Sequence, residues 1–197
     1  MRGFRTFALT ACAVLLAAGL TGALQQKQPP AIPAAPSIQE AALAEQNRWY
    51  GTASLRLFEQ NMAREIPEEA VRKEFAGSYF EEDGRVKIGI VGEENLAKYQ
   101  SLLPKDRQED GILSLECKHF SKQELTAFKE QLDSHFFEWE LSHTAVDIQR
   151  NCVMILVKSE AIRKTVVRHL AEEFPHADPA AFHIEVNPHR YATLEAY

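Results

Sequence analysis

Residues 79–91 (YFEEDGRVKIGIV) and 145–157 (AVDIQRNCVMILV) decide the fold of this 197-residue chain, because each stretch predicts two short strands joined by a tight turn. In the first stretch Asp83-Gly84 predicts the turn, since glycine accepts the positive φ that such turns demand. In the second stretch Arg150-Asn151 takes that place, and asparagine is the next most tolerant residue for a left-handed conformation. The apolar runs IGIV and MILV occupy matching places, so the two stretches read as copies.

The same two elements follow each predicted hairpin. An amphipathic helix is predicted over residues 93–103 in the first copy and over residues 160–174, after Ser159 as its cap, in the second. A third strand is predicted after each helix, at residues 114–120 and at Phe182–Val186. We therefore expect an α+β fold of duplicated ββαβ units, with two small antiparallel sheets and helices packed on one face of each.

A central helix is predicted between the two copies, over residues 121–140. Ser121 and Glu124 have the spacing of a capping box, which favours a helix start at this point. Five large apolar residues of this stretch share one helical face: Leu125, Phe128, Leu132, Phe136 and Trp139. We expect that face to be buried and the helix to link the two copies.

Helices are also predicted before the first copy. Residues 38–62 contain no proline, although Gly51 weakens the helical pattern. The large apolar residues near one stripe of this helix are Leu43, Trp49, Tyr50, Leu57, Phe58 and Met62. A second, short helix is predicted over residues 66–75, with Pro67 at its start and Gly77 as its C-terminal stop.

A secretory signal peptide is predicted at the N-terminus. Arg2 and Arg5 precede an uncharged apolar run, and Thr21-Gly22-Ala23 supplies small residues for cleavage after Ala23. An uncleaved membrane anchor is the alternative, because the apolar run approaches the length that spans a bilayer. Four prolines in the next stretch favour an extended linker.

The predicted organisation follows from these boundaries. We expect a signal peptide at residues 1–23, a Pro-rich linker at 24–37, a helical segment at 38–77, the duplicated ββαβ domain at 78–188 and a C-terminal tail at 189–197. The predicted localisation is secreted or cell envelope.

Charge and cysteine usage narrow the classes of partner. Cleavage after Ala23 removes two positive charges, so the formal charge of −6 becomes −8. So acidic a chain does not attract nucleic acid or anionic membrane by bulk electrostatics, and we expect neither as a partner. Export places Cys117 and Cys152 in an oxidising space where a disulfide is possible, but each also lies in an apolar strand where cysteine packs as a small buried residue.

Motifs that carry chemistry are missing from the sequence. There is no G-x-S-x-G elbow, H-E-x-x-H pair, Walker glycine loop or dinucleotide fingerprint. His183 and His189 bracket a strand end with Glu185 between them, but structural metal sites show tighter clusters of ligands. We expect no catalytic residue, no cofactor and no metal, and therefore a protein that binds rather than one that reacts.

Three short motifs carry a resemblance to a known family. The first hairpin contributes Phe80, Glu82, Asp83, Gly84, Val86 and Ile88, the central helix Phe120, Ser121, Glu124 and Leu125, and the second hairpin Asp147, Asn151 and Val153. Between residues 75 and 188 the chain thereby resembles the prodomain of secreted chymotrypsin-like bacterial serine proteases, of the alpha-lytic protease and streptogrisin type. In that family a protease domain follows the prodomain, whereas this sequence has no G-D-S-G-G, so we expect a stand-alone module.

The resemblance implies a function and a site. Prodomains of this family template the folding of their protease and inhibit it, with the C-terminal tail lying in the active-site cleft like a product. Carried over, residues 189–197 are the inserting tail, Tyr197 fills the specificity pocket, and Tyr191 and Leu194 are the other apolar anchors. The implied partner is a chymotrypsin-like protease bound in trans. The alternative is a membrane-tethered envelope domain that displays an acidic surface for interaction or adhesion.

Overall fold

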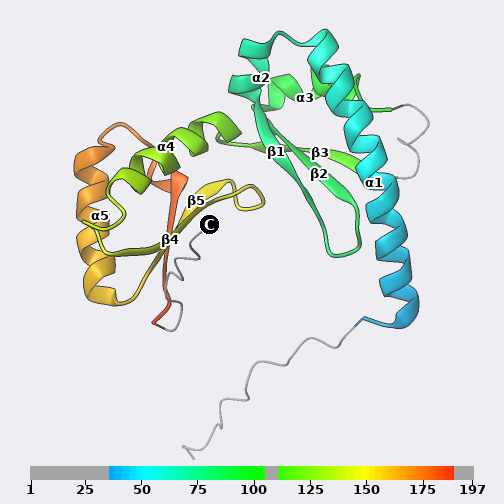
Figure 1. Cartoon of the computed structure of the whole chain (residues 1–197). Helices are drawn as coiled ribbons and strands as arrows, with labels where there is room; N and C mark the ends of the chain where they lie inside the picture. Colours follow the sequence, from blue (N-terminus) through cyan, green and yellow to red (C-terminus); the bar gives the residue numbers. More distant parts are fainter. Residues whose placement is uncertain (1–35, 105–110, 189–197) are drawn as a thin grey trace, which may run out of the picture. The chain divides into compact units, whose positions relative to one another are not determined.

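The computed structural model describes residues 36–104 and 111–188, which belong to one compact unit that begins at Pro36. In chain order its elements are α1 (Ile38–Glu65), α2 (Glu68–Glu74), β1 (Phe75–Phe80), β2 (Val86–Val91), α3 (Glu93–Gln100), β3 (Leu113–Lys118), α4 (Lys122–Ser134), β4 (Leu141–Asp147), β5 (Cys152–Val157), α5 (Glu160–Glu173), the short 3₁₀ helix η2 (Pro179–Ala181) and β6 (Phe182–Val186) (Figure 1). No helix in the described ranges is long and apolar enough to cross a membrane. The predicted signal peptide and tail lie outside those ranges.

The strands form two three-stranded sheets with the same topology. The orders are β1-β2-β3 and β4-β5-β6, so the α+β class and the repeated ββαβ order are confirmed. The first two strands of each sheet are antiparallel, but the third strand runs parallel to the middle one. The expectation of antiparallel sheets is therefore wrong, because the intervening helix returns the chain to the end where the middle strand began.

The hairpins match in detail. Their connections, residues 81–85 and 148–151, each contain one residue with positive φ, Gly84 at 82° and Asn151 at 55°. Both connections are longer than a two-residue turn. The register also shifts near the start of both first strands, between Phe75 and Gly77 and between Leu141 and His143. Such shared irregularities are consistent with duplication of one unit.

The first repeat buries one face of its sheet under helices. Val86, Ile88 and Ile90 alternate along β2 and are fully buried, as a strand with a single covered face requires. Phe58 of α1 and Tyr99 of α3 complete this core. Helix α1 is therefore part of the core of the first repeat. The predicted boundary between residues 77 and 78 does not divide two separately packed units.

Helix α1 begins as its sequence dictates but buries a different stripe from the one expected. Ser37 accepts a hydrogen bond from the Glu40 amide, and the Glu40 carboxylate accepts one from the Ser37 amide, which completes a capping box. The buried residues are Gly51, Ser54, Phe58 and Met62. Small residues at this face allow the helix backbone to approach the sheet closely: a Cβ on Gly51 would lie 2.8 Å from Cγ2 of Val86.

The predicted large apolar stripe of α1 is only partly correct. Phe58 and Met62 are buried, whereas Leu43, Trp49 and Leu57 are 57%, 69% and 48% exposed. Trp49 lies roughly opposite the stripe that packs on the sheet, whereas Leu43 and Leu57 lie beside that stripe, about 65° and 105° from its centre. Hydrophobicity alone cannot separate two faces of one helix when small residues line the buried one.

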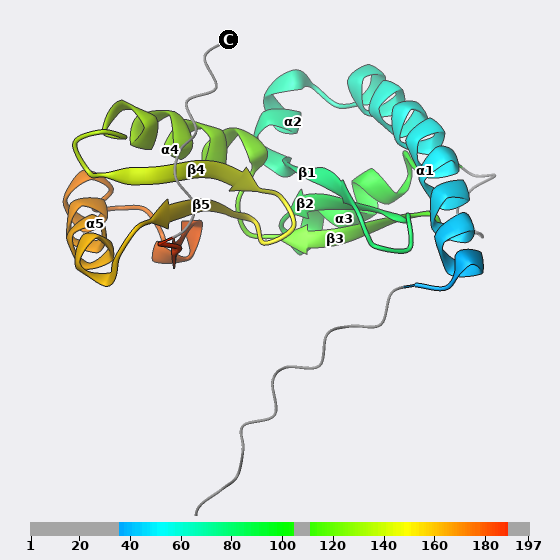
Figure 2. The same ribbon diagram turned by 60° about the horizontal axis from the view of Figure 1, so that its bottom comes forward.

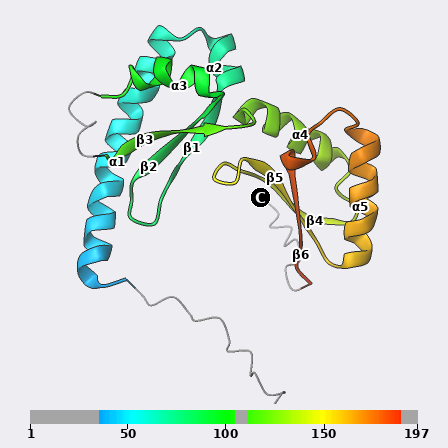
Figure 3. The ribbon, with the colours of Figure 1, turned by 180° about the vertical axis from the view of Figure 1, so that it is seen from behind.

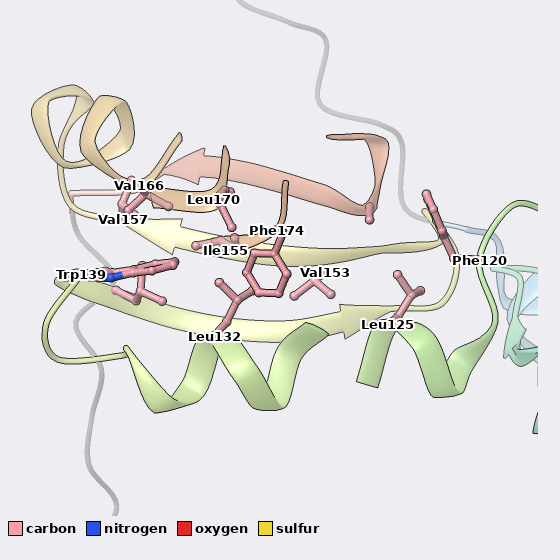
Figure 4. Close-up of a cluster of buried hydrophobic side chains, with 12 residues drawn as sticks. Phe120, Leu125, Leu132, Trp139, Val153, Ile155, Val157, Val166, Leu170 and Phe174 are labelled. Atoms are coloured by element: carbon pink, nitrogen blue, oxygen red, sulfur yellow. The ribbon is translucent and has the colours of Figure 1, made fainter. Parts of the chain in front are cut away.

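The second repeat has its own core, drawn in Figure 4. Val153, Ile155 and Val157 of β5 are fully buried under α4 and α5. Leu125 and Leu132 of α4 point at this sheet, as predicted. Val166 and Leu170 of α5, and Phe174 directly after this helix, approach the same sheet (Figure 4). Figure 2 shows α4 running along the β4–β5 hairpin.

Helix α4 is shorter than predicted. Ser121 caps it by accepting the Glu124 amide at 3.1 Å, as expected, but the helix ends at Ser134 rather than at residue 140. Residues 135–140 form turns that reverse the chain into β4, with Glu140 at a φ of 53°. Trp139 still reaches the predicted core, and it is buried there from the turn. No glycine or proline signals this helix end.

The end of α2 also differs from expectation. The helix passes directly into β1 at Phe75, and Gly77 lies within that strand instead of stopping the helix. Its φ of 107° accompanies the register shift of β1. A Cβ on Gly77 would lie 2.8 Å from Cδ1 of Ile148, so this glycine makes room for the turn of the second hairpin.

The second hairpin is fastened to the first repeat at its turn. The Asn151 Oδ1 atom accepts hydrogen bonds from the amides of His119 and Phe120, at 2.9 and 2.8 Å. Its Nδ2 atom donates to the Phe120 carbonyl at 2.8 Å. The Lys118 Nζ atom donates to the Gln149 carbonyl at 2.7 Å. We call the contacts that Asn151 and Lys118 make in this way the inter-repeat clasp.

The close approach of α1 to the first sheet predicts that Gly51→Ala destabilises the fold. Alanine improves helix propensity by about 1 kcal/mol, but overpacking a core costs about 1–3 kcal/mol. The clash is with Val86, which is fully buried and stiff at χ1, so it has no space to rotate away. We expect a net loss of about 1 kcal/mol in the free energy of unfolding, measured by urea denaturation.

A double-mutant cycle checks the cause. In the Val86→Ala background the added methyl group meets less crowding, so Gly51→Ala should cost less there or become stabilising. Equal costs in both backgrounds would contradict the close-approach explanation.

Candidate functional site

The predicted binding residues Tyr191, Leu194 and Tyr197 lie outside the described residues. The structure does define the point from which their segment leaves. Strand β6 ends at Val186, and the Asn187 amide donates to the Val157 carbonyl at 2.9 Å, which extends the pairing with β5 by one residue. Pro188 follows. The tail therefore starts beside the end of an edge strand.

Strand β6, labelled in Figure 3, is one of the two outer strands of its sheet, because the strand order is β4-β5-β6. Within residues 36–104 and 111–188, no further strand pairs with its free side. Successive residues of a strand direct their backbone groups to alternate sides, and Asn187 points toward β5. Ile184 and Val186 accordingly direct their backbone N–H and C=O groups to the outer side. An edge of this kind is a template for pairing with another extended segment.

An apolar groove of about 240 Å³ runs beside this edge. Helix α5, β6 and the segment between them form it, with Val167, Leu170, Ala171, Phe174, Ala177, Pro179, Phe182 and Ile184 as its lining. Val167 is 52% exposed at the rim. Two aromatic rings belong to the lining: the centroids of Phe174 and Phe182 lie 5.1 Å apart, and Phe128 contacts both. The floor of the groove is thus formed by aromatic side chains that pack against one another.

A second hollow, of about 550 Å³, adjoins the groove and shares Phe174 and Ala177 with it. Its polar lining comprises His119, Glu124, Glu173, His176 and Asp178. The Nε2 atom of His119 lies 3.2 Å from Oδ2 of Asp178, and the other oxygen of Asp178 accepts the Ala180 amide at the start of η2. Three carboxylates around one hollow favour a basic group in whatever binds there.

Cys117 and Cys152 do not form the possible disulfide. Both are free: Cys117 is exposed on β3 and Cys152 is buried in β5. They belong to different sheets, which places them in separate packing environments. Burial, reinforced by the negative charge of Asp147, raises the pKa of the Cys152 thiol. That thiol is therefore the less reactive of the two.

Two of the described histidines serve packing, and none belongs to a candidate metal site. His183 and Glu185 are exposed on β6, and no group of three potential metal ligands occurs in the described ranges. His135 and His169 stack on Trp139, with centroids 4.7 and 5.0 Å from its ring. No sequence spacing indicates this stack, since its members come from the turn after α4 and from α5.

Sequence reasoning missed the groove beside β6. Its members are distributed over α5, η2 and β6, and only folding brings them together. One signal was present: Val167 is an apolar residue outside the stripe of Ile162, Val166, Leu170 and Phe174. An isolated exposed apolar residue is common on protein surfaces, so it does not mark a site by itself.

Comparison with models of known protein families finds no match to this chain, and comparison with curated protein sequences finds none either.

The environments of the two cysteines predict distinct thiol reactivity. In the native protein we expect iodoacetamide to modify Cys117 rapidly and to modify Cys152 only after unfolding, because burial both shields that thiol and raises its pKa. Mass spectrometry of the alkylated peptides measures both sites. The Cys117→Ser variant is the control and should stay unmodified until denatured. If unreduced protein resists labelling at both sites even when unfolded, the cysteines are bridged and the free state is contradicted.

Proposed function

We propose that this chain is an exported, non-catalytic protein-binding module that acts in trans on a secreted chymotrypsin-like serine protease, as its inhibitor and folding chaperone. The observation that carries the proposal is the juxtaposition at β6. An unpaired strand edge, an apolar groove and the start of the C-terminal tail all lie within one segment of the second repeat.

The edge and the groove together suit an extended polypeptide. Backbone hydrogen bonds to Ile184 and Val186 supply affinity that does not depend on sequence, and a neighbouring pocket selects among side chains. The groove accommodates an apolar side chain, and Val167 at its rim is positioned to contact it. The acidic hollow next to it favours a basic neighbour.

The tail adds a second point of attachment. An extended terminal peptide can bind in a protease cleft through its backbone while its last side chain fills a pocket. Tyr197 is the large apolar residue at that end of the chain, with Tyr191 and Leu194 before it. Two linked contacts raise the overall affinity well above either one alone, provided that both can be made at once.

Inhibition and assisted folding follow from the same binding energy. A module that occupies the cleft of the native protease excludes substrate. Because it binds the native and not the unfolded protease, it also stabilises the native state by mass action. A single interface therefore supports both activities.

The groove predicts a specific loss of inhibition. We expect the secreted chain to slow peptide hydrolysis by a chymotrypsin-like protease of the same organism, and Val167→Asp to weaken the inhibition constant at least about tenfold by placing a charge in the apolar contact. Thr165→Asp is the matched control, since Thr165 is exposed on α5 outside the groove. Inhibition assays with both variants measure the contribution of the groove beside β6. The same assay with a chain that lacks residues 191–197 measures the contribution of the tail.

The outcomes separate the parts of the proposal. Loss of inhibition in the shortened chain, with circular dichroism unchanged, supports insertion of the tail. Equal inhibition by the full and shortened chains would refute tail insertion and leave the β6 edge as the interface. If the chain neither slows such a protease nor accelerates its refolding, the proposed function is wrong.

A further inference from the structure

The outward face of α1 carries large apolar side chains that are exposed to solvent. Trp49 is 69% exposed there, and it lies nine residues before the fully buried Phe58. At about 100° per residue those two side chains lie on opposite sides of the helix. Leu43 and Leu57 are 57% and 48% exposed. Large exposed apolar residues concentrated on one helix face mark an interaction surface.

The middle part of this outward face is uncharged. From Leu43 to Gln60 the positions within about 60° of its centre hold no acidic or basic residue. They are Leu43, Gln46, Trp49, Tyr50, Ala53, Leu57 and Gln60. The heptad spacing of Leu43, Tyr50 and Leu57 is the one that pairs helices along a seam.

Two opposite charges flank the face on one side. Glu45 and Arg56 are both exposed and are 11 residues apart, which is three turns with an offset of about 20°. In the described part of the chain neither side chain has an ion-pair partner. The midpoint between them falls at Tyr50-Gly51, close to the middle of α1.

We propose that α1 pairs antiparallel with α1 of a second copy of this chain, across a twofold axis near Tyr50. In that register Glu45 of each copy faces Arg56 of the other, so the dimer contains two Glu45–Arg56 ion pairs. In the same register Leu43 of one copy lies within one residue, about 1.5 Å, of the level of Leu57 of the other, and the large Trp49 lies equally close to the level of the small Ala53. The face is thus complementary to itself in charge and in size, as an isologous interface requires.

A second copy fits this face better than an unrelated partner does. Opposite charges placed symmetrically about the helix centre pair with each other when the partner is a second, antiparallel copy of the same helix. An unrelated partner does not require this symmetry. The apolar stretch from Leu43 to Leu57 is about 21 Å long, which limits the buried area to the low end of specific interfaces. The dimer is therefore reversible. It involves neither β6 nor the apolar groove, and it does not depend on the proposed function.

Sedimentation equilibrium of the full secreted chain over a concentration series tests the pairing. We expect a monomer–dimer equilibrium, and Trp49→Ala should weaken self-association at least about tenfold, as the loss of a central tryptophan anchor does. Phe137→Ala is the matched control: Phe137 is 80% exposed but lies in the turn after α4. Its removal should leave the equilibrium unchanged.

Charge exchange tests the register. Glu45→Arg and Arg56→Glu should each weaken self-association, because each places like charges together twice. An equimolar mixture of the two variants should form a heterodimer at the wild-type affinity, since every pair then regains opposite signs. Circular dichroism confirms that both variants fold.

Other results would overturn the proposal. A monomer at every concentration would do so, as would a mixture of the charge variants that stays monomeric. Binding of the monomer to phosphatidylcholine vesicles or to the protease, with loss of that binding in Trp49→Ala, would assign the face to that partner instead of a second copy.

Discussion

The side-chain amide of Asn151 is the interaction on which the rest of the structure depends. Asn151 is buried, and all three of its hydrogen bonds go to the two residues that connect β3 to the cap of α4. The same residue supplies the left-handed backbone that closes the second hairpin. One side chain therefore fixes the shape of a turn and joins that turn to the segment that leads from β3 into α4. Removing it would leave two amides and a carbonyl without partners, and unsatisfied buried groups are costly.

The inter-repeat clasp also fixes the positions of the residues around it. It fixes Phe120, a member of the second core, directly before the Ser121 cap, so α4 starts at a defined place. It also brings Ile148 onto Gly77, where only a missing Cβ leaves room. The two repeats thus share contacts although each has a separate hydrophobic core. At the far edge of the second sheet, β6 has no further strand paired with it among the described residues.

Local chemistry made much of this fold predictable. Turn residues such as Gly84 and Asn151, and caps such as Ser121 and Ser159, act within a few residues, and the structure places all four as the sequence indicated. The parallel third strands were missed although a helical crossover implies them. The outward Trp49 and the buried Gly51 were misjudged because close approach depends on small side chains, which hydrophobic periodicity does not detect. The groove beside β6 depends on contacts between α5 and β6 that no sequence spacing encodes, while the predicted tail residues lie outside the described ranges.

Native-state hydrogen exchange of the wild type and of Asn151→Gly tests the central claim, that this clasp makes the two repeats one cooperative unit. Glycine keeps the positive φ but removes all three hydrogen bonds, which together contribute about 3 kcal/mol. The account predicts that buried amides of β2 and β5 exchange with one common free energy in the wild type, and that the variant lowers the protection of β5 and separates the two values. Different free energies for β2 and β5 in the wild type, or unchanged protection in the variant, would contradict it.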